Sequence, residues 1–357
     1  IPEHAIFNES IEVAKILGHV GTGKYVTAIL HNIGRQGLRN ISEIKEPIRR
    51  LSIERSLPIW LIEALISQNG EEATRAMLET INDAPKQSIR VNTTLASDEE
   101  VEQALAAEKF TTVKSRVAAH AYIVSGGHVA SSKAFHDGLL TLQDESAMLP
   151  VESMRLTENV KMILDAAAAP GGKTTQIAQS VGENVTITAL DIHEHKIKLI
   201  QSNAERLHVT EKIHTRVLDA RKVPTEIEQK FDRILVDAPC SGFGLLRRKP
   251  EIRYDKTLTD VENLAHLQFE ILDSVSQNVT DNGMIVYSTC TILRQENDDV
   301  ITKFLLKHSD FELVPTQTSK NLKPNRSEDV LHVYPNDYQT DGFFVATLQK
   351  KMSTDNV

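Results

Sequence analysis

The chain is poor in cysteine and in long apolar runs. Among its 357 residues only Cys240 and Cys290 are cysteines, and neither lies in a CxxC pair. This usage argues against a disulfide framework and is typical of a reducing cytoplasm. No stretch approaches the ~18 consecutive apolar residues of a membrane span, and the opening IPEHAIFNES has no signal-peptide pattern. We therefore expect a cytoplasmic protein that does not enter a membrane.

Other deficits narrow the possible functions. Aromatic residues make up only 5% of the chain, so broad stacking on single-stranded nucleic acid is not expected. The thirteen histidines are scattered without paired spacing, so no metal site is predicted. A net charge of −9 does not favour generic coating of nucleic acid. One basic segment, RRKPEIR, still offers candidates for holding phosphates, although such a run is more often a solvated face: Arg247, Arg248, Lys249 and Arg253.

Hydrophobic periodicity divides the chain into three parts and a tail. Residues 1–67 carry apolar residues at three- and four-residue spacing, which predicts helices. Residues 68–140 mix helical and strand-like runs and predict a small α/β module. In residues 141–350, runs rich in Ile and Val alternate with helical runs, which predicts an α/β fold with a mainly parallel sheet covered on both faces. The last two strand-like runs predict an antiparallel hairpin at the sheet edge, and residues 351–357 are expected to be disordered.

Acidic residues end four strand-like runs of the 141–350 part. Ligands of open α/β sheets bind outside the carboxyl ends of the strands. The first run leads into DAAAAPGGKTT, where Gly171 and Gly172 allow close backbone approach and the helix that starts there offers free N–H groups to an anion. The second acid lies near the ~20-residue offset at which a carboxylate holds ribose hydroxyls. The pattern predicts a cofactor with an adenosine group. The four acids are Asp165, Asp191, Asp219 and Asp237.

Other nucleotide-binding patterns fit poorly. GHVGTGKY matches GxxxxGK, but Tyr25 replaces the hydroxyl residue that binds magnesium, and a helical run precedes it. APGGKT has Ala167 where a phosphate-binding loop needs its first glycine. The segment AAAAPGG likewise lacks the first glycine of the dehydrogenase motif GxGxxG. Hydrolysis of nucleoside triphosphates and hydride transfer are therefore disfavoured.

Both cysteines lie where a strand-like run ends. Cys240 follows ILVDAP and precedes a glycine-rich segment with cations close behind it. Cys290 follows IVYST and precedes a predicted helix start. Cations and helix N-termini both favour the thiolate, which is the nucleophilic form. We expect both sulfurs to face the cofactor crevice, and the residues alone leave the roles of the two thiols open.

Taken together, these motifs resemble those of S-adenosylmethionine-dependent RNA cytosine-C5 methyltransferases. The resemblance runs from about residue 140 to 350 through QDESA, LDAAAAPGGKTT, ALDI, VLDA, DAPCSGFGLLRRKPEIRY, YSTCTILRQEN and TDGFF. It implies a Rossmann-like, seven-stranded methyltransferase sheet. The segment FNESIEVAK…KYVTAILHNI resembles the end of a NusB-like RNA-binding domain, which marks the branch that modifies 16S rRNA. Ala167 departs from the family pattern, which often has Cys at this position.

The resemblance also implies roles for the site residues. Cys290 would be the nucleophile, Cys240 would assist proton removal or release of the adduct, and Asp237 would hydrogen-bond the cytosine. Asp191 would bind the ribose of S-adenosyl-L-methionine and Asp219 its adenine. The cofactor set is completed by Asp237 and by the loop Ala167, Ala168, Ala169, Pro170, Gly171, Gly172 and Lys173, whose last three residues would border the methionine end.

The implied substrate is a cytosine of 16S rRNA or of a small-subunit precursor, unpaired or turned out of its stack. The module 68–140 would add RNA contacts, and we expect a monomer. Two alternatives stay open: a non-catalytic RNA-binding ribosome-assembly factor, and a cytosine-C5 methyltransferase acting on tRNA or another rRNA. Two intact cysteine motifs argue against the first alternative.

Overall fold

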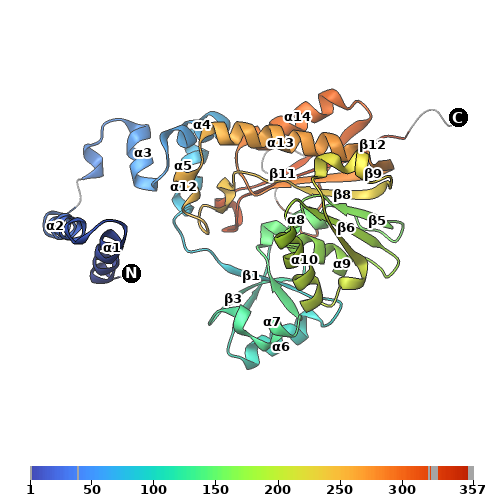
Figure 1. Cartoon of the computed structure of the whole chain (residues 1–357), viewed down its shortest axis with the longest axis horizontal. Helices are drawn as coiled ribbons and strands as arrows, with labels where there is room; N and C mark the ends of the chain where they lie inside the picture. Colours follow the sequence, from blue (N-terminus) through green and yellow to red (C-terminus); the bar gives the residue numbers. More distant parts are fainter. Residues whose placement is uncertain (1, 38–39, 321, 323–328, 353–357) are drawn as a thin grey trace. The chain divides into compact units, whose positions relative to one another are not determined.

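The computed structural model describes residues 2–37, 40–320, 322 and 329–352 (Figure 1). The chain forms two compact units, Ile1–Glu54 and Arg55–Val357. Residues 353–357 of the tail expected to be disordered lie outside the described residues.

The first unit is helical, as its periodicity predicts. His19 caps the second helix, because its side chain accepts hydrogen bonds from the backbone N–H groups of Gly21 and Thr22. Most of the segment GHVGTGKY thus lies inside a helix and does not form a strand-to-helix turn, which agrees with the rejection of a phosphate-binding loop. The elements are α1 (Glu3–Leu17), α2 (Val20–Gln36), a 3₁₀ turn (Ile41–Glu43) and α3 (Pro47–Arg55), whose last residue belongs to the second unit.

The second unit begins with two helices and a small antiparallel sheet of order β2-β3-β1-β4. Apolar residues on one face of this sheet, including Ile89 and Val91, pack against α6 and α7. Arg90 lies between them in the strand, so its side chain leaves from the opposite face. The elements are α4 (Ile59–Asn69), α5 (Glu71–Thr80), β1 (Gln87–Val91), α6 (Asp98–Ala107), β2 (Thr111–Lys114), β3 (Ala121–Ser125), α7 (Lys133–His136) and β4 (Leu140–Leu142).

The larger sheet has the order β10-β12-β9-β8-β5-β6-β7, with β11 also paired to β12. The pairs among β9, β8, β5, β6 and β7 are all parallel. The strands are β5 (Met162–Asp165), β6 (Thr186–Asp191), β7 (Ile213–Val217), β8 (Phe231–Asp237), β9 (Val279–Thr289), β10 (Phe311–Val314), β11 (Val330–Val333) and β12 (Phe343–Lys350).

Seven strands were predicted for this sheet, and it contains eight, because two short strands share one position beside β12. One edge of β12 pairs with β9, and its other edge pairs first with β11 and then with β10, so these two short strands lie end to end. The antiparallel pairing of the last two strands is confirmed. The position of this hairpin at the sheet edge is also confirmed, because β11 lies at the edge beside β10 and β12 is the next strand inward.

Helices cover both faces of the larger sheet (Figure 1). One core cluster joins α8, α9 and α10 to the sheet, and a second joins α11, α13 and α14 to its other face. Asp144 caps α8 by accepting a hydrogen bond from the backbone N–H of Ser146. The helices are α8 (Glu145–Glu152), α9 (Gly172–Ser180), α10 (Glu194–Arg206), α11 (Val223–Glu226), α12 (Ile252–Asp255), α13 (Leu258–Ser276), α14 (Asp298–Lys307) and α15 (Pro335–Tyr338).

Candidate active site

The loop after β5 turns sharply into α9. Its last residue, Gly171, has a φ of +103°, a backbone conformation that residues with a side chain rarely adopt. A Cβ at this position would also lie 3.1 Å from the Cα atom of Ile200 in α10. The turn presents the N-terminus of α9 to the carboxyl edge of the sheet, where its backbone N–H groups can bind an anion.

Asp165, the last residue of β5, stabilises the turn between β5 and α9. Its side chain is buried and accepts a hydrogen bond from Thr174 Oγ1 in the first turn of α9 at 2.7 Å. Burial raises the pKa of Asp165 to about 7, although the bond from Thr174 acts in the opposite direction. The strand end and the helix start are therefore joined through one buried side chain.

A pocket of about 330 Å³ lies at the carboxyl ends of the parallel strands. It brings together the predicted residues Asp191, Asp219 and Asp237 with Ala167 and Ala169 of the loop. Its walls also contain apolar side chains that no sequence motif indicated, among them Ile192, Leu267 and Ile271. The other predicted loop residues belong to the same turn but are not part of the pocket wall: Ala168, Pro170, Gly171, Gly172 and Lys173.

The two acids at one end of the pocket are held in place by local contacts. Asp191 ends β6 and accepts a hydrogen bond from the backbone N–H of His193 at 2.9 Å. Asp219 follows β7 and forms an ion pair with Arg221 at 2.7 Å. The hydrogen bonds from Arg221 lower the pKa of Asp219, so this carboxylate stays ionised. Carboxylates in such positions can accept hydrogen bonds from a ribose or an adenine amine.

The two thiols meet at the opposite wall of the pocket. Cys240 follows β8 and Cys290 follows β9, and these strands are parallel neighbours in the sheet. The two Sγ atoms lie 3.0 Å apart, and both residues line the pocket. The contact with Cys290 and burial both raise the pKa of Cys240 well above its usual value. Cys240 is therefore a protonated thiol that faces the sulfur of Cys290.

A buried carboxylate fixes the loop that carries Cys240. Glu296 is fully buried and accepts hydrogen bonds from the backbone N–H and the hydroxyl of Ser241, the residue after Cys240. Gln268 of α13 donates to both Glu296 and the carbonyl of Pro239 at 2.9 Å. The Ser241 hydroxyl also lies 3.0 Å from that of Thr291, the residue after Cys290. The network thus joins both cysteine loops. The only sequence signal for Glu296 is its position in the segment TILRQEN, directly after Cys290.

Asp237 is held beside the thiols by two partners. Lys173 of α9 forms an ion pair with its Oδ2 at 2.8 Å, and Ser288 of β9 donates to its Oδ1 at 2.8 Å. The Lys173 ammonium also lies 4.9 Å from the ring centroid of Phe343. The first turn of α9 therefore contributes a cation that orients the acid of the Asp-Ala-Pro-Cys segment.

Gly244 brings three loops into backbone contact. Its N–H donates to the carbonyl of Cys290, and its own carbonyl accepts from the N–H of Gly342, both at 2.9 Å. A Cβ on Gly244 would lie 2.0 Å from the Gly342 carbonyl oxygen and 2.7 Å from that of Cys290. Only a glycine fits here, a requirement that the sequence pattern of the segment SGFG did not indicate.

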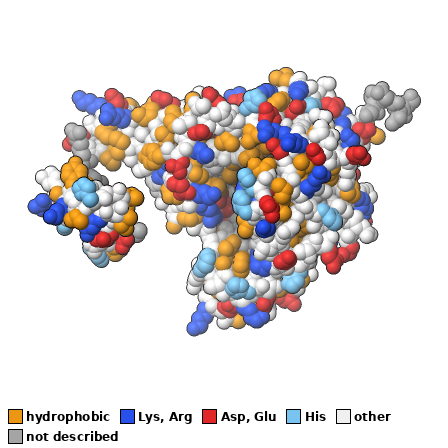
Figure 2. Space-filling model, viewed as in Figure 1, with side chains coloured by type: hydrophobic (Ala, Val, Ile, Leu, Met, Phe, Trp, Pro, Cys, Tyr) orange, Lys and Arg blue, Asp and Glu red, His pale blue; other side chains and the backbone are white. Residues whose placement is uncertain are grey.

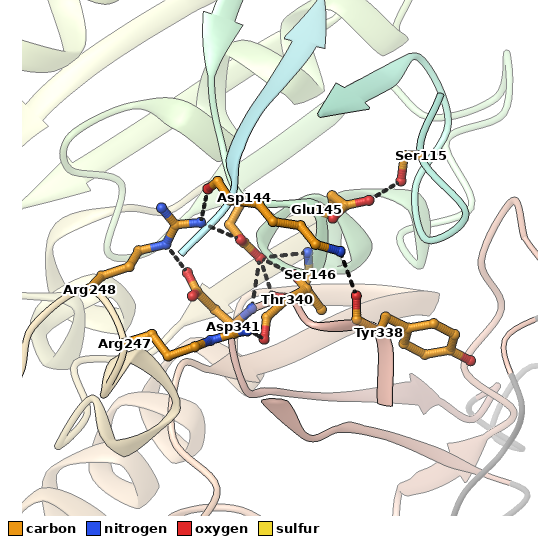
Figure 3. Close-up of polar contacts among 10 residues, drawn as sticks. Ser115, Asp144, Glu145, Ser146, Arg247, Arg248, Tyr338, Thr340 and Asp341 are labelled. Atoms are coloured by element: carbon orange, nitrogen blue, oxygen red, sulfur yellow. Dashed lines mark hydrogen bonds and ion pairs between the residues drawn. The ribbon is translucent and has the colours of Figure 1, made fainter. Parts of the chain in front are cut away.

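The predicted basic patch is largely engaged within the protein (Figure 3). Arg248 pairs with Asp144 at 2.7 Å and with Asp341 at 2.6 Å, and Arg247 donates to the carbonyl of Thr340. These contacts join the segment before α8 to the loops that follow β8 and precede β12.

The other two predicted basic residues differ from each other. Arg253 is buried and donates to the carbonyls of Arg55 and Ile81 and to the side chain of Asn82. Lys249 is exposed. On the face of the second unit drawn in Figure 2, acidic and basic side chains are interspersed. Three of the four predicted phosphate ligands therefore have structural partners.

The described residues contain neither a metal-binding cluster nor a membrane-spanning helix. No group of three or more His, Cys, Asp or Glu side chains in the described ranges could hold a metal ion. None of the helices in that part of the chain is long and apolar enough to cross a membrane.

The pocket fits S-adenosyl-L-methionine. Its apolar walls suit an adenine, and the carboxylate of Asp191 suits ribose hydroxyls. The N-terminus of α9, in the same turn but outside the pocket wall, offers N–H groups that suit the carboxylate of the methionine part. The positive φ of Gly171 and the close approach of Ile200 explain why a glycine occupies the turn before α9.

Comparisons with known proteins show the family of the chain. Residues 153–349 match the family model of the 16S rRNA methyltransferase RsmB/F, and residues 57–129 match the ferredoxin-like domain of RsmF/B-like methyltransferases. The chain is 39% identical to the probable ribosomal RNA small subunit methyltransferase B of Bacillus subtilis (strain 168) over 98% of this chain and 79% of that protein.

Two solved structures are similar to the chain over most of its length. The crystal structure of PH0851 matches with a TM-score of 0.86 at 29% identity, over 98% of this chain and 77% of that one. A methyltransferase homolog protein from Pyrococcus horikoshii matches with a TM-score of 0.74 at 26% identity, over 85% of this chain and 99% of that one. The chain therefore belongs to the 16S rRNA methyltransferase RsmB/F family and is an S-adenosylmethionine-dependent rRNA methyltransferase.

Proposed function

We propose that the protein methylates C5 of a cytosine in 16S rRNA through a covalent adduct between Cys290 and C6 of the base. The observation that carries this proposal is the approach of Cys240 and Cys290 to 3.0 Å at one wall of the cofactor pocket. The names of the relatives, which are small-subunit rRNA methyltransferases, support 16S rRNA as the substrate.

The reaction needs a nucleophile because C5 of cytosine reacts too weakly on its own. The Cys290 thiolate adds to C6, and the electron pair of the C5–C6 double bond becomes available at C5. The cofactor supplies an electrophilic methyl group on a sulfonium. After C5 has formed its bond to this methyl group, the C5 proton leaves to a base, the double bond reforms and the Cys290–C6 bond breaks. Thiolate is regenerated, so atoms and charge balance.

The protonation state of Cys240 supports this division of roles. A pKa raised by Cys290 and by burial keeps Cys240 in the thiol form, which is a poor nucleophile but a possible donor. The thiol form suits proton donation during the expulsion of Cys290, whereas removal of the C5 proton would require Cys240 to give up its own proton first. Asp237, oriented by Lys173 and Ser288, accepts a hydrogen bond from the polar edge of the cytosine.

The remaining predicted residues bind the two substrates. Asp191 contacts the ribose and Asp219 the adenine, and the loop 167–173 borders the methionine end of the cofactor. The target cytosine turns out of its stack to enter the pocket. Among the basic residues, exposed Lys249 is the candidate for a flanking phosphate. Helices α1 and α2 form the end of a NusB-like domain, and the four-stranded module adds RNA contacts.

Two single variants test the thiol roles. Cys290→Ala should form no adduct and transfer no methyl group, while it still binds S-adenosylhomocysteine. Cys240→Ser should accumulate a protein–RNA adduct that survives a denaturing gel, because addition proceeds but release is slowed. The double variant is the matched control and should show no adduct. If Cys290→Ala traps RNA and Cys240→Ser does not, the roles are reversed. Bisulfite sequencing of 16S rRNA with and without the gene would identify the base, and its failure to find a changed cytosine would refute the C5 assignment.

A further inference from the structure

A buried arginine of the ferredoxin-like module reaches the cofactor loop. Arg90 lies in β1, between β3 and β4, and only 4% of the residue is exposed. Its guanidinium donates to the carbonyl of Gly172 at 2.9 Å and to Thr175 Oγ1 at 3.1 Å. Its Nε donates to the side chain of Gln179 at 3.1 Å. All three acceptors belong to α9, so the side chain connects the module to the helix that begins at the cofactor loop.

The acceptors of Arg90 in turn hold the start of α9. Thr175 donates to the carbonyl of Gly171 at 2.8 Å. Gln143, which also accepts from Arg90, donates to the side chain of Gln176 at 3.0 Å. The Arg90 network therefore includes Gly171 and Gly172, which form the sharp turn of the cofactor loop. A shift of the guanidinium would move this turn.

The charge of Arg90 is unusual for its position. No carboxylate among the described residues pairs with it, and its recorded acceptors are carbonyl, hydroxyl and amide oxygens. Burial lowers the pKa of Arg90 to about 9, with a smaller contribution from Arg206, so the group is charged at neutral pH. A cation at a helix N-terminus adds to the positive end of the helix dipole, which disfavours the empty site and favours a bound anion. The carboxylate of the methionine part of the cofactor is such an anion.

We propose that Arg90 is a positioning residue for the methionine end of S-adenosyl-L-methionine. It holds the turn at Gly171–Gly172 and raises the positive potential at the N-terminus of α9. The ferredoxin-like module thereby completes the cofactor site, in addition to any contacts that it makes with RNA. This inference rests on the proposed placement of the methionine part beside residues 171–173.

The same interface contains a matched control. Arg206 of α10 extends in the opposite direction and donates to the carbonyls of Phe135 and Leu140 and to Thr141 Oγ1 in the module. Its guanidinium also lies 4.0 Å from the ring centroid of Phe135. Loss of Arg206 weakens the junction between module and catalytic domain, yet its recorded contacts do not include α9. The two arginines therefore separate a general loss of the interface from a specific effect on the cofactor loop.

Calorimetric titration of the full chain with two ligands tests the proposal. S-adenosylhomocysteine carries the amino-acid carboxylate, and 5′-methylthioadenosine lacks it. Arg90→Met should weaken S-adenosylhomocysteine binding tenfold or more but methylthioadenosine binding less than threefold. Arg90→Lys, which keeps the charge, should bind S-adenosylhomocysteine more tightly than Arg90→Met. Arg206→Met should change either affinity less than threefold.

Two outcomes would overturn the proposal. Equal losses for both ligands in Arg90→Met would show that the carboxylate end is not involved. Equal losses in Arg90→Met and Arg206→Met would show only a damaged interface. Thermal unfolding of each variant identifies a misfolded protein, in which case Arg90→Lys carries the test. Because these titrations contain no RNA, failure of the proposed adduct chemistry would leave their result unchanged.

Discussion

Substitution of Gly244 should displace Cys290, the proposed nucleophile, without changing its side chain. In Gly244→Ala the added Cβ would lie 2.0 Å from the Gly342 carbonyl oxygen and 2.7 Å from the Cys290 carbonyl oxygen, whereas contacts under 3.0 Å are essentially never observed. The first oxygen must therefore retreat by at least about 1 Å and the second by about 0.3 Å. Both obstacles are backbone atoms, so no side-chain rotation can relieve the clash.

The expected cost follows from these displacements. Overpacking of a tight site costs about 1–3 kcal/mol, and the two hydrogen bonds through Gly244 are worth about 1 kcal/mol each. With both hydrogen bonds lost, we expect the free energy of unfolding to fall by about 3–5 kcal/mol. A displacement of a reacting group by ~1 Å can lower a rate by about 10²-fold. Since the Cys290 backbone shifts by less than this, a loss of about 10- to 100-fold in methyl transfer is expected.

Urea unfolding and single-turnover methyl transfer measure the two effects. Gly182→Ala is the matched control, because no heavy atom lies within 4 Å of the added Cβ and its backbone is not in the left-handed region. It should retain the wild-type rate and change stability by less than about 0.5 kcal/mol. Binding of S-adenosylhomocysteine by Gly244→Ala should stay within threefold of wild type. Wild-type turnover in Gly244→Ala would refute the view that this contact sets the position of Cys290.

Two further predictions concern buried carboxyls. In Glu296→Ala the Ser241 N–H loses its acceptor, and Gln268 Nε2 keeps only its bond to the Pro239 carbonyl. Each lost bond costs about 1–3 kcal/mol, so urea unfolding should show a loss of about 2–6 kcal/mol. Glu296→Gln, which keeps one acceptor oxygen, should lose less, and equal losses would contradict the network. Because burial raises the pKa of Asp165 from 3.8 to about 7, the folded protein retains a proton that the unfolded chain releases near pH 4. As pH rises from about 4 to 7, wild-type stability should therefore fall relative to Asp165→Asn by up to roughly 4 kcal/mol, at about 1.36 kcal/mol per pH unit; a difference that does not change with pH would refute this.

The strand-end residues were predictable because two simple rules determine their place. Alternating strands and helices imply parallel strands, and parallel strands end at the same edge of a sheet. Asp191, Asp219 and Asp237 were predicted to meet on these grounds, and all three line one pocket. The same rules put Cys240 and Cys290 on one edge. The two rules do not predict the 3.0 Å separation of their Sγ atoms, because this distance also depends on β8 and β9 being neighbours in the sheet order.

The basic segment shows where sequence reasoning stops. Four cations after a cysteine motif look like phosphate ligands because a local pattern contains no information about distant acids. Asp144 lies 104 residues from Arg248, and Asp341 lies 93 residues away. Burial raises the pKa of Asp341 to about 6, and Asp144 acts in the same direction, so the arginine also relieves repulsion between two carboxyls. The choice between a structural cation and an RNA-binding one is made by tertiary partners.

Residues that support the site are harder to predict from sequence than residues that are proposed to react. Reacting groups must be particular residue types at strand ends, so type and position together identify them. A supporting group needs only a hydrogen-bonding side chain at a suitable point in space, and many positions satisfy that requirement. Arg90 reaches Gly172 across 82 residues, from a module with its own separate core. From its position in a strand, Arg90 is expected to be an ordinary polar residue on an exposed face. Only the packing of that face against α9 makes Arg90 part of the proposed cofactor site. Small modules in such enzymes should therefore be tested for effects on the cofactor as well as on RNA.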